Sequence, residues 1–253
     1  MDGQSAFKDE PMQTGRWLNM TVSIVAALAI VGCNSTPPPP RPYGVETTLS
    51  MPASRHGVWA VAPTINLSGQ RPVDPLLESD LVYTQLQAVR GLTVIPVNRV
   101  VEVYLALRID KVQSQDQANL VCDLLGCDGL VVPTVTVFDP YDPPKLGAAL
   151  QLFMKPGAYT RPVGLDAHDL THQAAGSSTD AIPTASGLVQ AVGIFDAANG
   201  SVRQAVLAFA NGRYDPAGPY GSREYIVSMD GFSGFVYHEL IGQLLASPQL
   251  SGT

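Results

Sequence analysis

Two histidines, His168 and His172, stand four residues apart beside the carboxylates of Asp166 and Asp169. On a helix this spacing would place both imidazoles on one face, where they could hold a zinc ion. The common zinc hydrolases also carry a glutamate directly after the first histidine as a general base, and Asp169 occupies that position here. We therefore expect a solvated loop around this cluster and predict neither a metal nor another cofactor. A metal-dependent hydrolase is the remote alternative.

Cys122 and Cys127 form a second pair of reactive side chains, five residues apart. In an oxidising compartment they could form a disulfide between the end of an expected helix and the start of the next strand. Because the closed loop is short, the bond would contribute about 2 kcal/mol at best. The alternative is two buried free thiols. Metal binding by these two residues would require further soft ligands.

Motifs for nucleophilic catalysis or nucleotide binding are missing from the sequence. Residues 231–235 read Gly-Phe-Ser-Gly-Phe, which has the wrong spacing for the Gly-x-Ser-x-Gly nucleophile turn. The neighbours His238 and Glu239 fall in an expected helix and are more typical of a surface pair than of an acid–base couple. No glycine-rich phosphate loop occurs. The sequence therefore predicts a protein that is not an enzyme.

Residues 57–253 predict the domain that would position these side chains, an α/β fold with a mixed sheet and helices packed on it in two or three layers. Short apolar or alternating runs predict the strands, at 57–63, 92–96, 128–138, 146–154 and 188–196. Helical periodicity predicts the helices, at 73–90, 98–107, 114–125 and 225–245. The Asn199-Gly200 step predicts a hairpin that returns through a strand at 202–210.

Two further features of this domain concern its loops and its helix faces. The region around 155–186 is rich in glycine, proline, serine and threonine, so it is an insertion that is either functional or disordered. The helices at 73–90 and 98–107 carry apolar residues at helical intervals, among them Leu77 in the first and Leu105 in the second.

The composition excludes two classes of protein. Hydrophobic residues make up 45% of the chain and charged residues 15%, which argues against an intrinsically disordered protein. The formal net charge is −7 and no cluster of lysine and arginine occurs, so nucleic acid is not expected as a partner.

An apolar run at residues 18–32 follows Arg16 and ends in Ile30-Val31-Gly32-Cys33. It is shorter than the roughly 20 residues that cross a bilayer and has the length of a signal-peptide core. The closing residues resemble the lipobox of bacterial lipoproteins. That resemblance implies cleavage after Gly32, giving a signal peptide at 1–32, and attachment of diacylglyceryl and acyl groups such as palmitate to Cys33. The alternative is an ordinary signal-anchor helix.

Residues 33–56 fit a tether between a lipidated Cys33 and the folded domain. Four consecutive prolines, residues 37–40, favour an extended polyproline II spacer. Such a run can also be a recognition site for aromatic grooves. Asn34 stands where an aspartate would signal retention at the inner membrane. We therefore expect an anchored protein of the cell outer membrane that faces the periplasm.

Three stretches of the expected domain carry a second resemblance. They are residues 58–69, which include Val-Trp-Ala-Val-Ala-Pro and Asn-Leu-Ser-Gly; 90–95, Arg-Gly-Leu-Thr-Val-Ile; and 124–132, Leu-Leu-Gly-Cys-Asp-Gly-Leu-Val-Val. Their order resembles the periplasmic α/β domain shared by the curli secretion-channel lipoproteins, the penicillin-binding-protein activator lipoproteins and the amino-terminal domain of TolB. Cys127 replaces the alanine usual in that group, and Pro133 interrupts the following strand.

This resemblance implies a non-enzymatic cell-envelope lipoprotein that acts as a protein-binding or assembly module. Its partners would be the membrane, through Cys33, and either another periplasmic protein or further copies of itself. The alternative is a subunit of a curli-type secretion channel. A channel requires inserted strands of about 9 to 11 residues that alternate apolar and polar side chains. The region 155–186 lacks that alternation, so we rank the channel below the binding module.

Overall fold

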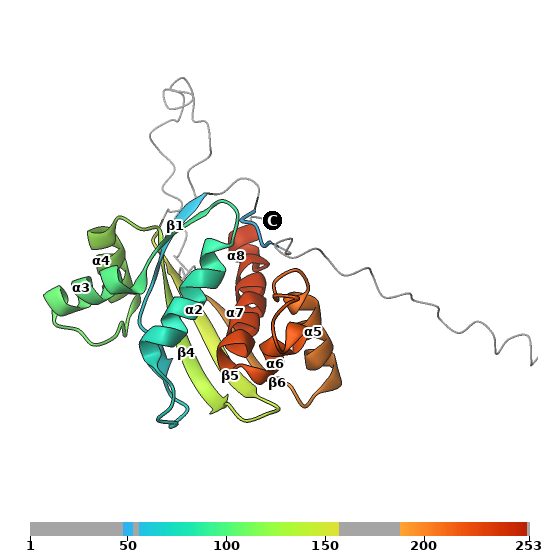
Figure 1. Cartoon of the computed structure of the whole chain (residues 1–253). Helices are drawn as coiled ribbons and strands as arrows, with labels where there is room; N and C mark the ends of the chain where they lie inside the picture. Colours follow the sequence, from blue (N-terminus) through green and yellow to red (C-terminus); the bar gives the residue numbers. More distant parts are fainter. Residues whose placement is uncertain (1–47, 53–55, 157–187, 252–253) are drawn as a thin grey trace, which may run out of the picture. The chain divides into compact units, whose positions relative to one another are not determined.

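The computed structural model describes residues 48–52, 56–156 and 188–251. They form a mixed six-stranded sheet with the strand order β3-β1-β4-β5-β6, and β2 pairs with part of β4 (Figure 1). The predicted α/β class, a mixed sheet with packed helices, is confirmed. The apolar leader, the proline run and most of the predicted insertion lie outside the described residues.

The strands fall into a parallel half and an antiparallel half. Their bounds are β1 (Gly57–Val61), β2 (Ile65–Asn66), β3 (Leu92–Ile95), β4 (Gly129–Asp139), β5 (Lys145–Met154) and β6 (Leu188–Asp196). β1 runs parallel to both β3 and β4, whereas β5 is antiparallel to β4 and β6 is antiparallel to β5. β2 lies between the strand predicted at 57–63 and the helix predicted at 73–90, and it pairs with β4 through two residues.

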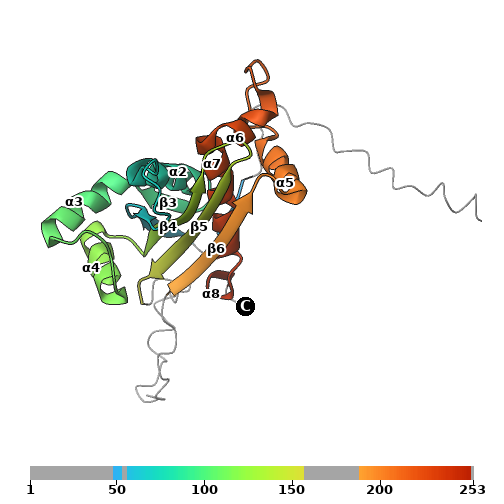
Figure 2. The ribbon, with the colours of Figure 1, turned by 90° about the horizontal axis from the view of Figure 1, so that it is seen from below.

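Helices cover the two faces of the sheet unequally. Their bounds are α2 (Pro75–Gln87), α3 (Val97–Leu107), α4 (Gln115–Leu125), α5 (Gly200–Ala210), α6 (Glu224–Val227), α7 (Met229–Leu245) and α8 (Pro248–Ser251). α2 and α7 bury apolar side chains against one face, in a core that includes Trp59 of β1 and Leu150 of β5. α3 and α4 cover the other face at β1 and β4, around Ala60 and Leu130. The domain therefore has three layers at β1 and β4 and two layers at β5 and β6 (Figure 2).

Capping residues fix several helix ends where the sequence predicts them. The Asp74 carboxylate accepts a hydrogen bond from the Leu76 N–H at 2.9 Å at the start of α2. Ser114 caps α4, and Gly126 ends that helix with a φ of 69°, a conformation that glycine adopts without strain. Ser228 interrupts the predicted helix at 225–245, because it caps α7 and separates it from α6.

The predicted hairpin after β6 is wrong, because residues 200–210 form the helix α5 rather than a returning strand. Asn199 is the N-cap of this helix, and its side-chain oxygen accepts the Ser201 N–H at 2.9 Å. The same Asn-Gly step that favours a tight hairpin turn also suits a helix start. The following run contains good helix formers such as alanine, leucine and glutamine, and it buries Val206 and Phe209 on one side.

Only some of the apolar residues that recur at helical intervals in α2 and α3 are buried. Leu77 of α2 is 43% exposed and Leu105 of α3 is 73% exposed. The buried apolar positions are Val82 and Leu86 in α2, and Val100 and Tyr104 in α3. Both helices carry apolar residues on more than one side, so periodicity alone does not identify the side that meets the sheet.

The stretch just before β1 contacts the domain. Met51 is 5% exposed within the main core, and its N–H donates to the Arg90 carbonyl at 2.9 Å. This residue belongs to the range 33–56 that the sequence predicts as a tether. Within residues 48–52, 56–156 and 188–251, no helix combines the length and the apolar character that crossing a membrane requires.

Candidate interaction surface

The predicted lipidation residue Cys33 and the histidine pair His168 and His172 lie outside the described residues. In the part of the chain that the structure describes, no group of three or more histidine, cysteine, aspartate or glutamate side chains is arranged to hold a metal ion.

Cys122 and Cys127 are brought together at the end of α4, where both are buried as free thiols. The turn that joins them is closed by a hydrogen bond of 3.0 Å from the Cys127 N–H to the Cys122 carbonyl. A hydrogen bond also links the two thiols; together with burial it raises the pKa of Cys122 above the ordinary thiol value. The same hydrogen bond lowers the pKa of Cys127, against the opposing effect of burial. The two buried thiols have the proximity for a disulfide.

His238 and Glu239 do not form an acid–base couple. The imidazole of His238 packs against the ring of Phe209, with 5.0 Å between the ring centroids. Burial, with a contribution from the nearby Arg213, lowers the pKa of His238 to about 4. The histidine is therefore neutral over most of the physiological pH range and takes part in packing between α7 and α5.

A buried polar contact joins α2 to α7. The hydroxyl of Tyr237 donates to Oε2 of Glu78 at 2.5 Å, and Glu78 is 3% exposed. Burial raises the pKa of Glu78, while the hydrogen bond from Tyr237 opposes that shift. The neighbouring Ser233, in the Gly-Phe-Ser-Gly-Phe run, is fully buried beside this pair. A substrate has no route to this serine, so its role is structural.

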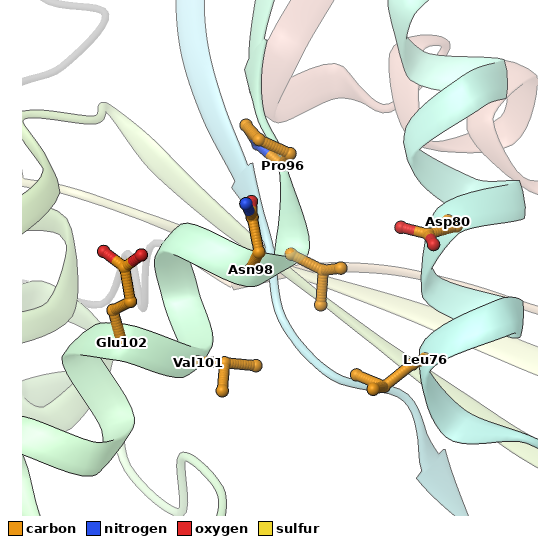
Figure 3. A pocket seen from close by; sticks show the side chains of 7 residues that line it. Leu76, Asp80, Pro96, Asn98, Val101 and Glu102 are labelled. Carbon is orange, nitrogen blue, oxygen red and sulfur yellow. The ribbon is translucent and has the colours of Figure 1, made fainter.

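A pocket of about 660 Å³ opens between α2 and α3, beyond the end of β3 (Figure 3). Its lining is mainly apolar, including Leu76 from α2 and Val101 from α3. Asp80 and Glu102 lie on opposite sides of it (Figure 3). Glu102 is already paired with Arg99 at 2.6 Å on the surface. With its mainly apolar lining, the pocket offers a shallow binding surface.

A further feature is the face of β5 and β6 opposite α7, over which α3 and α4 do not extend, apart from the contact of α4 with the end of β5 (Figure 2). We call this surface the open face and define it by six residues of the two strands: Gly147, Ala149, Gln151, Gln190, Val192 and Ile194. Val192 is 56% exposed and Ile194 is 66% exposed. Two large apolar side chains exposed on neighbouring positions of one strand face are unusual for a surface and typical of an interaction site.

The alternation of β6 shows why this face is open. Val189 and Ala191 point to the opposite face and are buried in the core under α7, at 3% and 4% exposure. A strand with apolar residues on both faces normally has both faces covered. The helices α3 and α4 cover β1 and β4 but do not extend over β6 (Figure 2).

A second pocket, of about 510 Å³, lies beside the turn between β4 and β5. Lys145 lines this pocket and pairs with Asp196 at the end of β6, with 2.6 Å between the charged atoms. The pairing raises the pKa of Lys145 and lowers that of Asp196. These two charges therefore neutralise each other at one end of the open face.

Sequence analysis did not identify the open face. Its signal is visible in residues 189–194, where apolar side chains occur at both odd and even positions. That pattern predicts a strand buried on both faces, and only the placement of the helices shows that one face lacks a cover among the described residues.

No protein-family model matches this chain, and no curated protein matches it significantly. Among solved structures the chain is similar to the LpoB C-terminal domain from Salmonella enterica, at 13% identity over 40% of this chain and 73% of that chain, with a TM-score of 0.32. It is similar to the lipoprotein GNA1162 from Neisseria meningitidis, at 19% identity over 38% and 67%, with a TM-score of 0.30. The hypothetical protein CT253 from Chlamydia trachomatis aligns at 12% identity over 79% and 100%, with a TM-score of 0.39. At these TM-scores the similarities identify neither a family nor a function.

Proposed function

We propose that this protein is a non-enzymatic lipoprotein of the cell envelope, held to a membrane through Cys33, that binds other protein chains through the open face. The observation that carries the binding role is the exposure of Val192 and Ile194 on a strand face without a covering helix in the described part of the chain. Covering these side chains with a protein partner would remove apolar surface from water.

The chemistry of the described residues agrees with binding rather than catalysis. The candidate groups for an acid, a base or a nucleophile are Glu78, His238, Cys122 and Ser233. Each takes part in packing or in a buried contact, and none lines either pocket. One pocket lies between α2 and α3 and the other beside the turn between β4 and β5.

The proposed anchor is supported by the lipobox-like residues 30–33 and by the proline run at 37–40 that follows them. An extended spacer of this kind would hold a folded domain away from the bilayer and leave its faces accessible. Asn34 favours the outer membrane, with the domain in the periplasm.

Lipid labelling tests the anchor. Cells that make the full chain or its Cys33→Ala variant are grown with a fatty-acid probe and separated into membrane and soluble fractions. We expect the wild type to carry the probe and to remain with the membranes, and the variant to lose the probe. Cys33→Ser, which keeps a small polar side chain but not the sulfur, should lose the probe in the same way. Label-free wild-type protein in the soluble fraction would overturn the proposed anchor.

A further inference from the structure

The edge strand β6 lacks the features that normally prevent one sheet from pairing with another. Its nine residues contain no proline, and their only charge is Asp196 at the last position. The pairing with β5 is continuous from Lys145 to Phe153 without a bulge. Protein edges are usually protected by charges, prolines, bulges or short length. The opposite edge, β3, has only four residues.

The sequence of β6 is also suited to pairing with itself. In an antiparallel pair, residues that lie directly opposite each other point to the same face of the sheet. In a symmetric pair of β6 strands, the two-fold axis must therefore pass between two copies of the same residue. An axis at Val192, the middle of Leu188–Asp196, is the register that gives all nine residues a partner. Val192 then faces Val192 of the second copy, and Gln190 faces Ile194.

Such a pair would make the two open faces continuous. The exposed Val192 and Ile194 of one copy would gain the same side chains of the other as cross-strand and diagonal neighbours, which is the contact that stabilises sheets. On the opposite face, Val189 would meet Phe195 and extend the core that α7 covers. The pairing is closed and symmetric, because the same patch is used on both subunits.

We propose that two copies of this chain associate through antiparallel pairing of their β6 strands, with Val192 at the two-fold axis. This inference goes beyond the proposed function, because the second copy pairs with the edge of β6 and leaves the joined open faces uncovered. Each chain has a formal net charge of −7, so the copies repel at a distance and salt should strengthen the dimer. The charge-poor strand makes the contact itself free of like charges.

A charge-swap experiment tests the register. Full-length protein in mild detergent is analysed by sedimentation over a range of concentrations, as wild type and as the variants Val192→Lys and Val192→Glu. Each variant places like charges directly opposite each other, and we expect its dimerisation midpoint to rise about tenfold or more. An equimolar mixture of the two variants should restore a dimer, because lysine then faces glutamate. Leu105→Lys, at an exposed leucine of α3 outside β6, is the matched control and should leave the dimer unchanged.

Cysteine cross-linking gives a second test that does not depend on stability. A Val192→Cys variant should form a symmetric disulfide on mild oxidation, whereas an Ile194→Cys variant should cross-link efficiently only when mixed with Gln190→Cys. The wild type, with Cys122 and Cys127 buried, measures the background. A wild type that stays monomeric, a dimer unaffected by Val192→Lys, or equal cross-linking at positions 192 and 194 would overturn the inference. If position 192 instead cross-links to a different protein in cells, the inference fails while the proposed binding function stands.

Discussion

The hydroxyl of Tyr237 donates a hydrogen bond to Oε2 of Glu78 at 2.5 Å in the interface between α7 and α2, where Tyr237 is fully buried and Glu78 is 3% exposed. The two residues are 159 positions apart in the chain. A buried polar pair of this kind is stable only while both partners are in place. It therefore fixes how α7 lies against α2, and α7 in turn supports the underside of β5 and β6.

The pKa of Glu78 predicts a pH dependence of stability. Burial raises this pKa above the ordinary value of 4.5, so the folded state binds the proton more tightly than the unfolded state. The free energy of unfolding should then fall as the pH rises from 4.5 through the folded pKa, by at most about 1.4 kcal/mol per pH unit. In Glu78→Gln this decline should disappear. Denaturant unfolding of both proteins between about pH 4.5 and pH 8 measures it.

Asp80→Asn is the matched control for this experiment, because Asp80 lies on the same helix and is exposed. It should show the pH profile of the wild type. A Glu78→Gln protein that loses stability with rising pH as steeply as the wild type would contradict the assignment.

His238 predicts a pH dependence of the opposite sign. Burial lowers its pKa from 6.5 to about 4, so the unfolded state binds a proton between these two values and the folded state does not. The contribution of His238 to stability is therefore present above about pH 6.5 and is lost as the pH falls toward 4. Removing the imidazole in His238→Gln should flatten the acid side of the stability profile.

The exposed His56 provides the comparison for His238. His56→Gln should leave the profile unchanged, and a change as large as that of His238→Gln would refute the role of burial. Between about pH 4.5 and 6.5, Glu78 and His238 change the unfolding free energy with pH in opposite directions, so their contributions partly cancel in the wild type. Each single variant should therefore show the pH dependence that the remaining residue contributes.

Cys122 and Cys127 should be joined by a disulfide in exported protein, because the two thiols contact each other and the turn between them is already closed. Unfolding without a reductant, alkylation and mass analysis of the tryptic peptide 112–145 should find neither residue alkylated. The double variant Cys122→Ser and Cys127→Ser should lose about 2 kcal/mol of unfolding free energy at most. Two alkylated thiols in protein taken from the envelope would show that the pair is free.

The Asn199 cap predicts the behaviour of the helix that sequence analysis missed. Replacing Asn199 by alanine removes the acceptor for the Ser201 N–H and should cost about 1 kcal/mol of unfolding free energy. Asn199→Asp keeps an acceptor and should cost much less. Urea unfolding distinguishes the two. Equal losses in both variants would mean that the cap does not stabilise α5.

Much of the fold could be predicted from local patterns. Strands with clear runs of valine and leucine, such as β4, and helices with strong end signals, such as Ser114 and Gly126 around α4, were located nearly to the residue. The helix α5 was missed because the Asn199-Gly200 step suits both a hairpin and a helix start. The choice depends on tertiary packing, since Phe209 contacts Phe235 of α7 at 5.8 Å between ring centroids.

The open face could not be predicted because it depends on where the helices lie. Leu105 belongs to the apolar set that predicts α3 and is exposed, whereas Tyr104 beside it is buried against the sheet. Sequence periodicity shows that a helix has an apolar side but does not show which strands it covers. The exposure of Val192 and Ile194 follows only from α3 and α4 lying over β1 and β4.

Site-specific photo-cross-linking tests the central claim, that the tethered domain binds protein through its open face. A photoreactive amino acid is placed at Ile194, or at the similarly exposed Leu105 on α3 as the reference position, in the full chain within intact cells. We expect a discrete cross-linked protein species from position 194 and none, or only a diffuse background, from position 105. Membrane-bound protein that gives no discrete species at position 194, or the same species at both positions, would contradict the account.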